Sequence, residues 1–168
     1  MKKFLIIALV ALTSFSCMKN NYSRYSWSRT MLGTMTTTNL STGSSYVNET
    51  QYIKLEMEDA FVSMVNFYLL DVKFVEMMPA QPEIKMPNVP FTLSTDEEMP
   101  ANSWIISTSS LVPTIGGVPY EQYTMTDIHG VITDNYINLS FRVEMGGATY
   151  QVSYLSNSAN SGKEEDEE

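Results

Sequence analysis

The amino-acid sequence predicts an all-β protein, and three of its features carry that prediction. In residues 136–145 (YINLSFRVEM) apolar and polar side chains alternate from Ile137 onward, and in residues 51–58 (QYIKLEME) they alternate from Ile53 onward. A period of two is typical of a strand with one face in a core and the other in water. The pair Asp134-Asn135 separates two such segments, as the turn of a hairpin does.

The expected strands follow one another along the whole middle of the chain. In order they are residues 30–38, 51–58, 66–77, 103–108, 120–126, 129–133, 136–145 and 148–155. The first is rich in threonine, which packs well on a pleated surface. Residues 56–65 are the one ambiguous window. Four prolines between residues 79 and 90 predict short extended pieces there, because proline cannot donate a ladder hydrogen bond.

About eight short antiparallel strands predict an eight-stranded up-and-down barrel, since closure removes the exposed edges of a sheet. A two-sheet sandwich is the alternative. The barrel is expected to form one domain over residues 29–155, which is long enough to bury a single core.

Three stretches resemble a known family: MVNFYLLDVKFVEMMP, PNVPFTL and PYEQYTMTDIHGVITDNYINLSFRV. They are similar to the calycin-like β-barrel family of Bacteroidetes envelope lipoproteins, over about residues 28–155. The resemblance implies a fold and a location in the cell envelope, and it implies no reaction. Calycins include lipocalins and fatty-acid binders, which hold small apolar molecules inside the barrel, so ligand binding is an expectation by analogy.

The N-terminus has the parts of an export signal that ends at the only cysteine. Lys2 and Lys3 precede an apolar run over residues 4–12, and small polar residues lead to Cys17. The run is far shorter than the roughly 20 residues that span a bilayer. A signal that ends at a cysteine resembles a bacterial lipoprotein signal, although Ser14 stands where that pattern usually has leucine. The resemblance implies cleavage before Cys17 and attachment of lipid to its thiol.

These features predict the organisation of the two termini. Residues 1–16 are expected to be a lipoprotein signal peptide and residues 17–28 a lipidated tether, with an ordinary secretory signal as the alternative. The acyl chains would anchor the protein. No acidic residue directly follows Cys17, which favours the periplasmic face of the outer membrane over the cell surface. Residues 156–168 are low in complexity and acidic, so a disordered tail is expected.

The charge of the chain excludes two classes of partner. The formal net charge is −9, and it falls to −11 without Lys2 and Lys3. An anionic chain without a basic cluster is unsuited to nucleic acid. It is also not attracted to anionic lipid head groups. The sequence predicts no oligomeric state.

No catalytic signature is present, so we expect neither an enzyme nor a cofactor or metal. The only histidine is His129, and a zinc site needs three or four ligands. Asp127 and His129 share a face of their strand, and they would point inward if Met125 does; a hydrogen-bonded or exposed histidine is the simpler interpretation. No G-x-S-x-G motif occurs. The paired carboxylates at 56/58 and 97/98 are expected to be solvated surface.

The apolar residues suggest what the barrel does. Eleven of the 12 methionines follow residue 16, and the chain has 10 tyrosines. Both residue types serve adaptable binding surfaces. We expect a non-enzymatic envelope protein that binds a small apolar, lipid-like ligand in or at the mouth of the barrel. The residues expected to face inward are Ile53, Leu55, Tyr68, Leu70, Phe74, Phe141, Val152 and Tyr154.

The alternative function is a protein-interaction or structural module of the envelope. An eight-stranded barrel can be filled entirely by its own side chains. Such a module would make its contacts through residues 79–90 and 111–119.

Overall fold

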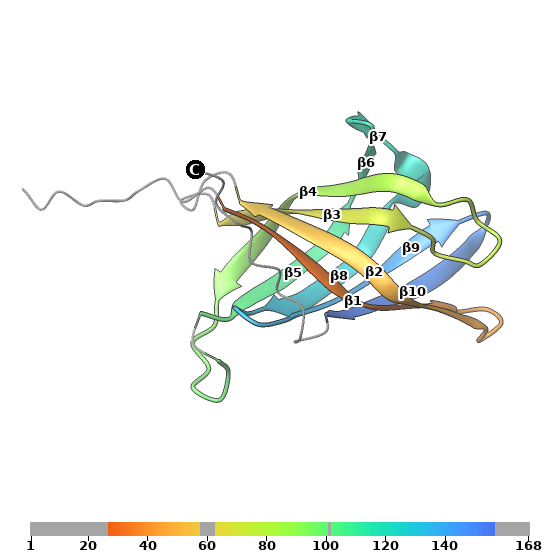
Figure 1. Ribbon diagram of the computed structural model, residues 1–168. Coiled ribbons are helices and arrows are strands. Elements are labelled where there is room, and N and C mark those ends of the chain that lie inside the picture. Colours follow the sequence, from red (N-terminus) through yellow and green to blue (C-terminus); the bar gives the residue numbers. More distant parts are fainter. Residues whose placement is uncertain (1–26, 58–62, 101, 157–168) are drawn as a thin grey trace, which may run out of the picture.

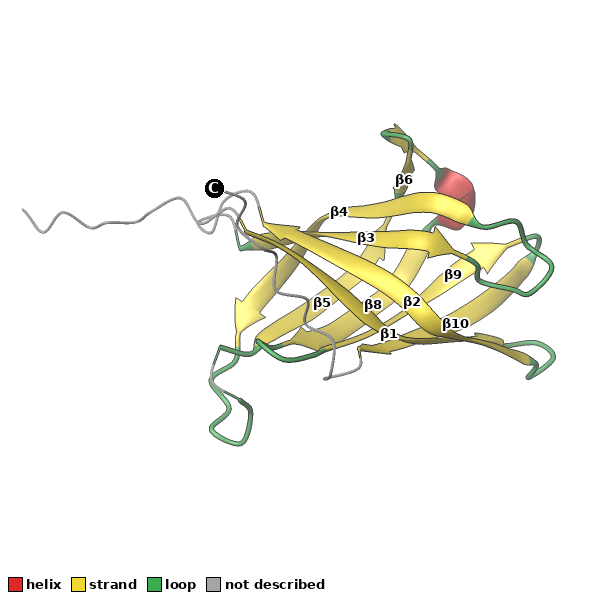
Figure 2. Ribbon diagram, in the orientation of Figure 1, coloured by secondary structure: helices red, strands yellow, loops and turns green. Residues whose placement is uncertain are grey.

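The computed structural model describes residues 27–57, 63–100 and 102–156. Cys17, the expected signal peptide, most of the expected tether and nearly all of the acidic tail lie outside these ranges. Within them the chain is a closed barrel of eight antiparallel strands (Figures 1 and 2), so the predicted fold class is confirmed.

The barrel strands pair in sequence order, and β1 also pairs with β10, which closes the sheet. They are β1 (Trp27–Asn39), β2 (Ser45–Met57), β3 (Met64–Val72), β4 (Gln81–Leu93), β5 (Trp104–Leu111), β8 (Met125–Ile132), β9 (Ile137–Met145) and β10 (Ala148–Ser156). Between β5 and β8 the chain adds a small hairpin, β6 (Thr114–Ile115) and β7 (Val118–Pro119), and one 3₁₀ turn, η2 (Glu121–Tyr123).

The proline-rich segment is one continuous strand, which corrects the prediction of short pieces. β4 contains Pro82, Pro87 and Pro90. β4 pairs with β5 only over Phe91–Leu93. Along much of the edge that faces β5 its backbone N–H groups therefore make no hydrogen bonds to a neighbouring strand, and proline, which has no N–H, is tolerated there. Asn88 takes a positive φ of 53° and donates its backbone N–H to the side chain of Asn66, which fixes a bulge beside the prolines.

A second correction concerns the segment before the C-terminal hairpin. Residues 120–126 and 129–133 were expected as two strands, but residues 125–132 form the single strand β8, and η2 replaces the beginning of the first. The total of eight strands is therefore right, although β4 has taken the place of one of this pair. The turns around Asp134-Asn135 and Gly146-Gly147 are where the sequence predicts them.

The barrel has two different ends. We call end A the end where β1 begins, β10 ends and the β8–β9 turn (residues 133–136) lies. End B carries the turns 40–44, 73–80, 112–124 and 146–147. In Figure 1 end A is on the left and end B, with η2, is on the right.

Arg29 forms a link across end A. This residue pairs with the inward-facing Leu55, so its side chain starts toward the interior. Its guanidinium donates to the carbonyl oxygens of Thr133, at 3.4 Å, and of Asp134. The arginine thereby ties the first strand to the β8–β9 turn across the end of the barrel.

Side chains from all eight strands fill the interior. The largest that are fully buried are Tyr154, Phe67, Phe74, Phe141, Met31, Met35, Ile53, Leu55, Leu69, Ile84, Met86 and Ile106. The Tyr154 ring lies over Gly33 of β1, where a side chain would collide with it, and its hydroxyl donates to the Met31 carbonyl at 2.9 Å. Burial of this kind satisfies the one polar atom of the ring.

Candidate functional site

Six of the eight residues expected to line a ligand site do face the interior. They are Ile53, Leu55, Phe74, Phe141, Val152 and Tyr154, each at most 1% exposed. The alternation of β2, β9 and β10 predicted five of these faces correctly, and Phe74 follows the end of β3. Their burial makes them core residues, and a role in ligand binding stays a prediction for each of them.

The other two, Tyr68 and Leu70, were predicted on the wrong face. Before Asp71, which takes a positive φ of 48°, the side chains of β3 that face the interior are Phe67 and Leu69. Tyr68 is only 9% exposed, but it pairs with Lys54 and Lys85 on the outer face. The irregularity at Asp71 shifts the alternation by one residue, so Val72 and Phe74 point inward as expected while the earlier part of the strand is inverted.

Tyr68 belongs instead to a small polar group on the outside of β2, β3 and β4. The ammonium groups of Lys54 and Lys85 lie 5.3 and 5.2 Å from the centre of its ring. Its hydroxyl donates to the Glu56 carboxylate, and Lys54 approaches the same carboxylate at 3.5 Å. The hydrogen bond from Tyr68 is the main reason that the pKa of Glu56 lies below its usual value.

Tyr68→Phe is therefore expected to raise the pKa of Glu56 toward its ordinary value. The folded-state pKa is depressed, so this carboxylate stabilises the fold above its unfolded pKa of about 4.5, and the contribution is lost as the pH falls through the folded value. Carboxyl chemical shifts followed by NMR against pH measure the change. Tyr52→Phe is the matched control on the same outer face, and a Glu56 titration that is the same in all three proteins would contradict the assignment.

The half-buried apolar side chains gather at end B. Among the described residues, seven such side chains pack against the core, and only Trp104 of these lies toward end A. The six at end B are Met78, Leu111, Ile115, Tyr123, Met145 and Tyr150. We call them the end-B cluster. They come from the strand ends and from the two long connections, 73–80 and 112–124, that cover this end (Figure 1).

Aromatic contacts connect the end-B cluster to the interior. Phe74, fully buried, meets the Tyr123 ring edge-on at 6.1 Å and the Phe141 ring at 6.3 Å. Tyr120 packs against Tyr123 at 4.9 Å on the outer side. A continuous path of aromatic rings thus runs from solvent at η2 to the middle of the barrel.

The hydroxyl of Tyr123 is partly shielded from water. Burial, helped by the neighbouring Tyr120, raises the pKa of the Tyr123 hydroxyl above its usual value. The rim beside it is hollowed by a shallow depression of about 470 Å³ between η2 and the β9–β10 turn, which Glu121 and Glu144 border. End B therefore combines an apolar floor with an acidic rim.

Tyr154 gives the interior a measurable response to alkali. Burial raises the pKa of its hydroxyl far above the usual 10.0. The pKa of Tyr154 is higher in the folded than in the unfolded protein. The neutral hydroxyl therefore contributes fully to the free energy of unfolding below about pH 10, and this contribution falls as the pH rises further. Urea unfolding at increasing alkaline pH is expected to show this decline, with a smaller one in Tyr154→Phe. An equal decline in both proteins would show that other groups cause it.

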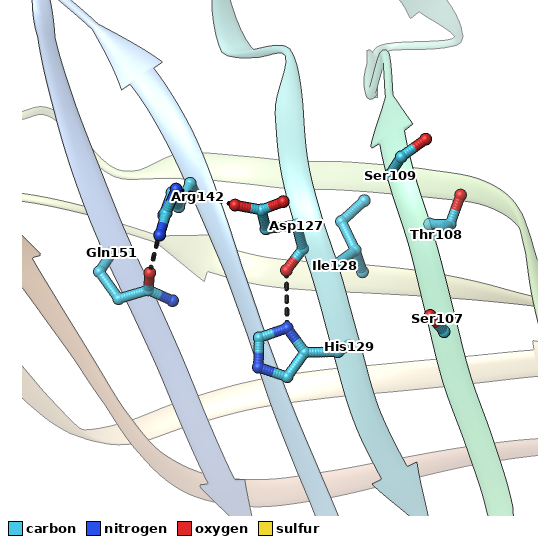
Figure 3. Close-up of a pocket in the computed structure, with 8 residues that line it drawn as sticks. All are labelled: Ser107, Thr108, Ser109, Asp127, Ile128, His129, Arg142 and Gln151. Carbon is cyan, nitrogen blue, oxygen red and sulfur yellow. Dashed lines mark hydrogen bonds and ion pairs between the residues drawn. The ribbon is translucent and has the colours of Figure 1, made fainter.

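The sequence also singled out Asp127 and His129, which lie in a hollow of about 400 Å³ on the outside of β5, β8, β9 and β10 (Figure 3). The Asp127 carboxylate accepts from Arg142 at 2.8 Å, and Arg142 Nε donates to Gln151 at 3.3 Å. His129 Nδ1 lies 2.8 Å from the backbone oxygen of Asp127. Figure 3 shows Arg142 between Asp127 and Gln151, and His129 against the backbone of Asp127.

The conditional expectation that Asp127 and His129 point inward is wrong. Met125 is fully buried, but Asp127 takes a positive φ of 50° and the register with β9 shifts there, so Ile128 is the next inward residue. His129 is exposed and hydrogen-bonded, as the simpler interpretation held. Among the described residues, no three side chains of His, Cys, Asp or Glu meet in a way that could hold a metal ion.

Sequence reasoning missed the aromatic part of end B. Residues 120–126 were expected as a strand, so Tyr123 was not placed over the barrel end. In the run PYEQY apolar and polar residues do not alternate as they do in a strand. This lack of alternation is the one feature of the sequence that could have argued against a strand here.

Comparisons with known proteins add no family. No family model matches the chain, and neither a curated protein nor a solved structure matches it. In the part of the chain that the structure describes, no helix is long and apolar enough to cross a membrane.

Proposed function

We propose that this protein is a lipid-anchored, non-enzymatic protein of the cell envelope that binds a small apolar molecule at end B of its barrel. The observation that carries the proposal is the end-B cluster. Its six side chains are half-buried, whereas the interior beneath them is fully buried. Apolar surface left half-exposed at one end of a barrel is where an apolar ligand gains most by covering it.

The nature of the side chains supports a site that adapts to its ligand. Met78 and Met145 belong to the end-B cluster, and Met125 and Met86 lie buried in the barrel. Methionine has flexible torsions and a polarizable sulfur, so it can rearrange around a ligand at small cost. A barrel filled by such side chains can therefore admit a molecule at its end without an empty cavity beforehand.

The positions of the two ends of the described chain suit the proposed anchor. Trp27 and Ser156 both belong to strand ends at end A, on the opposite side of the barrel from η2 (Figure 1). A tether from Cys17 would join the barrel at end A. The acyl chains on Cys17 would then hold end A toward the membrane and leave end B facing the periplasm, which is consistent with capture of a ligand from that space.

Native mass spectrometry is the direct test, on residues 18–168 purified from a bacterial periplasm without detergent. This chain contains every strand of the closed barrel. We expect a stoichiometric adduct of a small apolar molecule, and a rise in melting temperature with members of a panel of fatty acids, fatty alcohols, sterols and tetrapyrroles. Absence of both an adduct and any stabilising compound would overturn the proposal.

A matched pair of variants locates the site. Tyr123→Ala removes a half-buried ring at end B, and Trp104→Ala removes one toward end A, where it stacks on Phe91 at 4.5 Å. Binding is expected to weaken by about tenfold in Tyr123→Ala, because such a ring contributes on the order of 1.4 kcal/mol by burial. Trp104→Ala is expected to leave the affinity unchanged. Equal losses would place the site elsewhere.

One observation favours the second candidate, an interaction module. Met77 is 93% exposed and Val118 65% exposed, and both lie on connections at end B. Of the two contact segments expected for such a module, 79–90 is largely taken up by β4, while 111–119 projects as the β6–β7 hairpin. Alanine at Met77 and Val118 together should abolish binding of a protein partner and leave binding of a small molecule intact.

A further inference from the structure

One buried polar atom in the barrel has no partner among the described residues. The hydroxyl oxygen of Thr37 makes no hydrogen bond, although the residue is only 2% exposed. Other buried polar side chains have one: Gln51, for example, donates to the carbonyls of Tyr52 and Leu70. Leaving a buried hydroxyl unpaired is unfavourable, so such an atom calls for an explanation.

Thr37 lies in the half of the barrel interior that is nearer to end B. It is two residues from the end of β1, beside the 40–44 turn of end B. It pairs directly with Val152, which pairs with Phe141, and both of these side chains are fully buried. Directly paired residues point to the same face of a sheet, so the Thr37 hydroxyl is inside the barrel with them.

The surroundings favour a neutral partner for this hydroxyl. Among the described residues no charged side chain is buried, and Arg29 is engaged with turn carbonyls at end A. A carboxylate brought to Thr37 would therefore lose its hydration without gaining a cation. A hydroxyl, carbonyl or ether oxygen needs only one hydrogen bond, which a threonine can donate or accept.

We propose that the Thr37 hydroxyl anchors the polar end of a neutral ligand: an apolar molecule with a single hydrogen-bonding oxygen, of the class of long-chain alcohols and ketones. This inference rests on the proposed function. It narrows the ligand to molecules whose polar end is uncharged, and it excludes those with a carboxylate, such as fatty acids. The hydrogen bond to Thr37 would orient the ligand, so that its oxygen lies inside the barrel and its apolar chain extends toward the end-B cluster.

The test compares 1-octanol, octane and octanoate as probes, with residues 18–168 and two variants. Thr37→Val keeps the shape of the side chain and removes the hydroxyl. Thr36→Val makes the same change at the neighbouring, outward-facing position. Affinities are measured by displacement of an environment-sensitive fluorophore, and melting temperatures are measured without any probe.

In the wild-type protein octanol is expected to bind more tightly than octanoate by tenfold or more. The ratio of octanol affinity to octane affinity should fall about three- to tenfold in Thr37→Val, as loss of one neutral hydrogen bond predicts, and stay the same in Thr36→Val. Without probe, Thr37→Val should melt at the same temperature as wild type or higher, because it removes an unpaired buried hydroxyl.

Three results would overturn the inference while leaving the proposed function standing. They are an unchanged octanol-to-octane ratio in Thr37→Val, octanoate that binds as tightly as octanol, and a lower melting temperature of Thr37→Val without probe. The last would mean that the hydroxyl already has a partner in the folded protein, such as a buried water. Failure of all three probes to bind the wild-type protein would also overturn this inference, and the proposed function falls with it only if the adduct and the stabilising compounds are absent as well.

Discussion

Gly33→Ala is expected to destabilise the protein by about 3 kcal/mol or more, a large part of the 5–15 kcal/mol that holds a typical domain together. A Cβ at this position would lie 2.6 Å from the Cζ of Tyr154 and from the Cα of Ser156, and closer still to the Leu155 carbonyl oxygen. These atoms belong to β10, so the collision would open the β1–β10 pairing that closes the barrel. Urea unfolding measures the loss.

Gly43→Ala is the matched control for that change. Gly43 has a positive φ of 74° but nothing within 4 Å of a Cβ placed there. Its substitution is therefore expected to cost only about 1 kcal/mol, from the left-handed backbone conformation alone. A loss in Gly33→Ala that is no larger than this would mean that β1 and β10 can separate enough to admit a methyl group.

Phe74→Ala is expected to reduce the free energy of unfolding by about 3–5 kcal/mol, the usual cost of removing a buried aromatic ring. Phe74 follows the end of β3 and is in edge contact with Tyr123 and Phe141. Its loss also removes the support beneath the end-B cluster. We therefore expect faster hydrogen exchange in η2 than in the strands near end A, in addition to a lower midpoint of unfolding.

The neighbouring Met77→Ala serves as the control for Phe74→Ala. Met77 is 93% exposed, and substitutions at such positions change stability by no more than about 0.5 kcal/mol. A similar small effect in Phe74→Ala would show that end B repacks around the missing ring. Exchange that accelerates equally at both ends would show that the ring stabilises the barrel as a whole and has no special role at end B.

The sequence predicted the fold because strand alternation is a strong signal wherever strands are regular. In β9 the inward residues from Ile137 to Val143 follow the alternation without interruption. In β3 and β8 the prediction of faces failed because Asp71 and Asp127 take a positive φ, so the side chains before and after each of them do not follow one alternation. Aspartate tolerates this conformation better than most residues, but many aspartates in strands do not adopt it, so residue type alone does not locate the bulge.

The candidate site was harder to predict than the fold. Six inward residues were identified, but they are the core of the barrel, and alternation cannot distinguish core from ligand contact. The end-B cluster comes partly from irregular connections, including Tyr123 in η2, and has no periodic pattern. Thr37, whose hydroxyl has no partner, lies in the run TMTTT. Neighbouring threonines of this run point to opposite faces of the strand, and the residue type alone does not show which of them points inward.

The pairing of β1 with β10 also determines at which point of synthesis the barrel can close. Gly33 faces Ser156 in that ladder, so a newly made chain holds its first strand without one neighbour until its last strand exists. Contacts between such distant residues form slowly, and an unpaired first strand offers its free edge to other chains in the meantime. Biogenesis of this protein thus has a vulnerable interval that lasts until the final nine residues of the barrel, Ala148–Ser156, have been delivered.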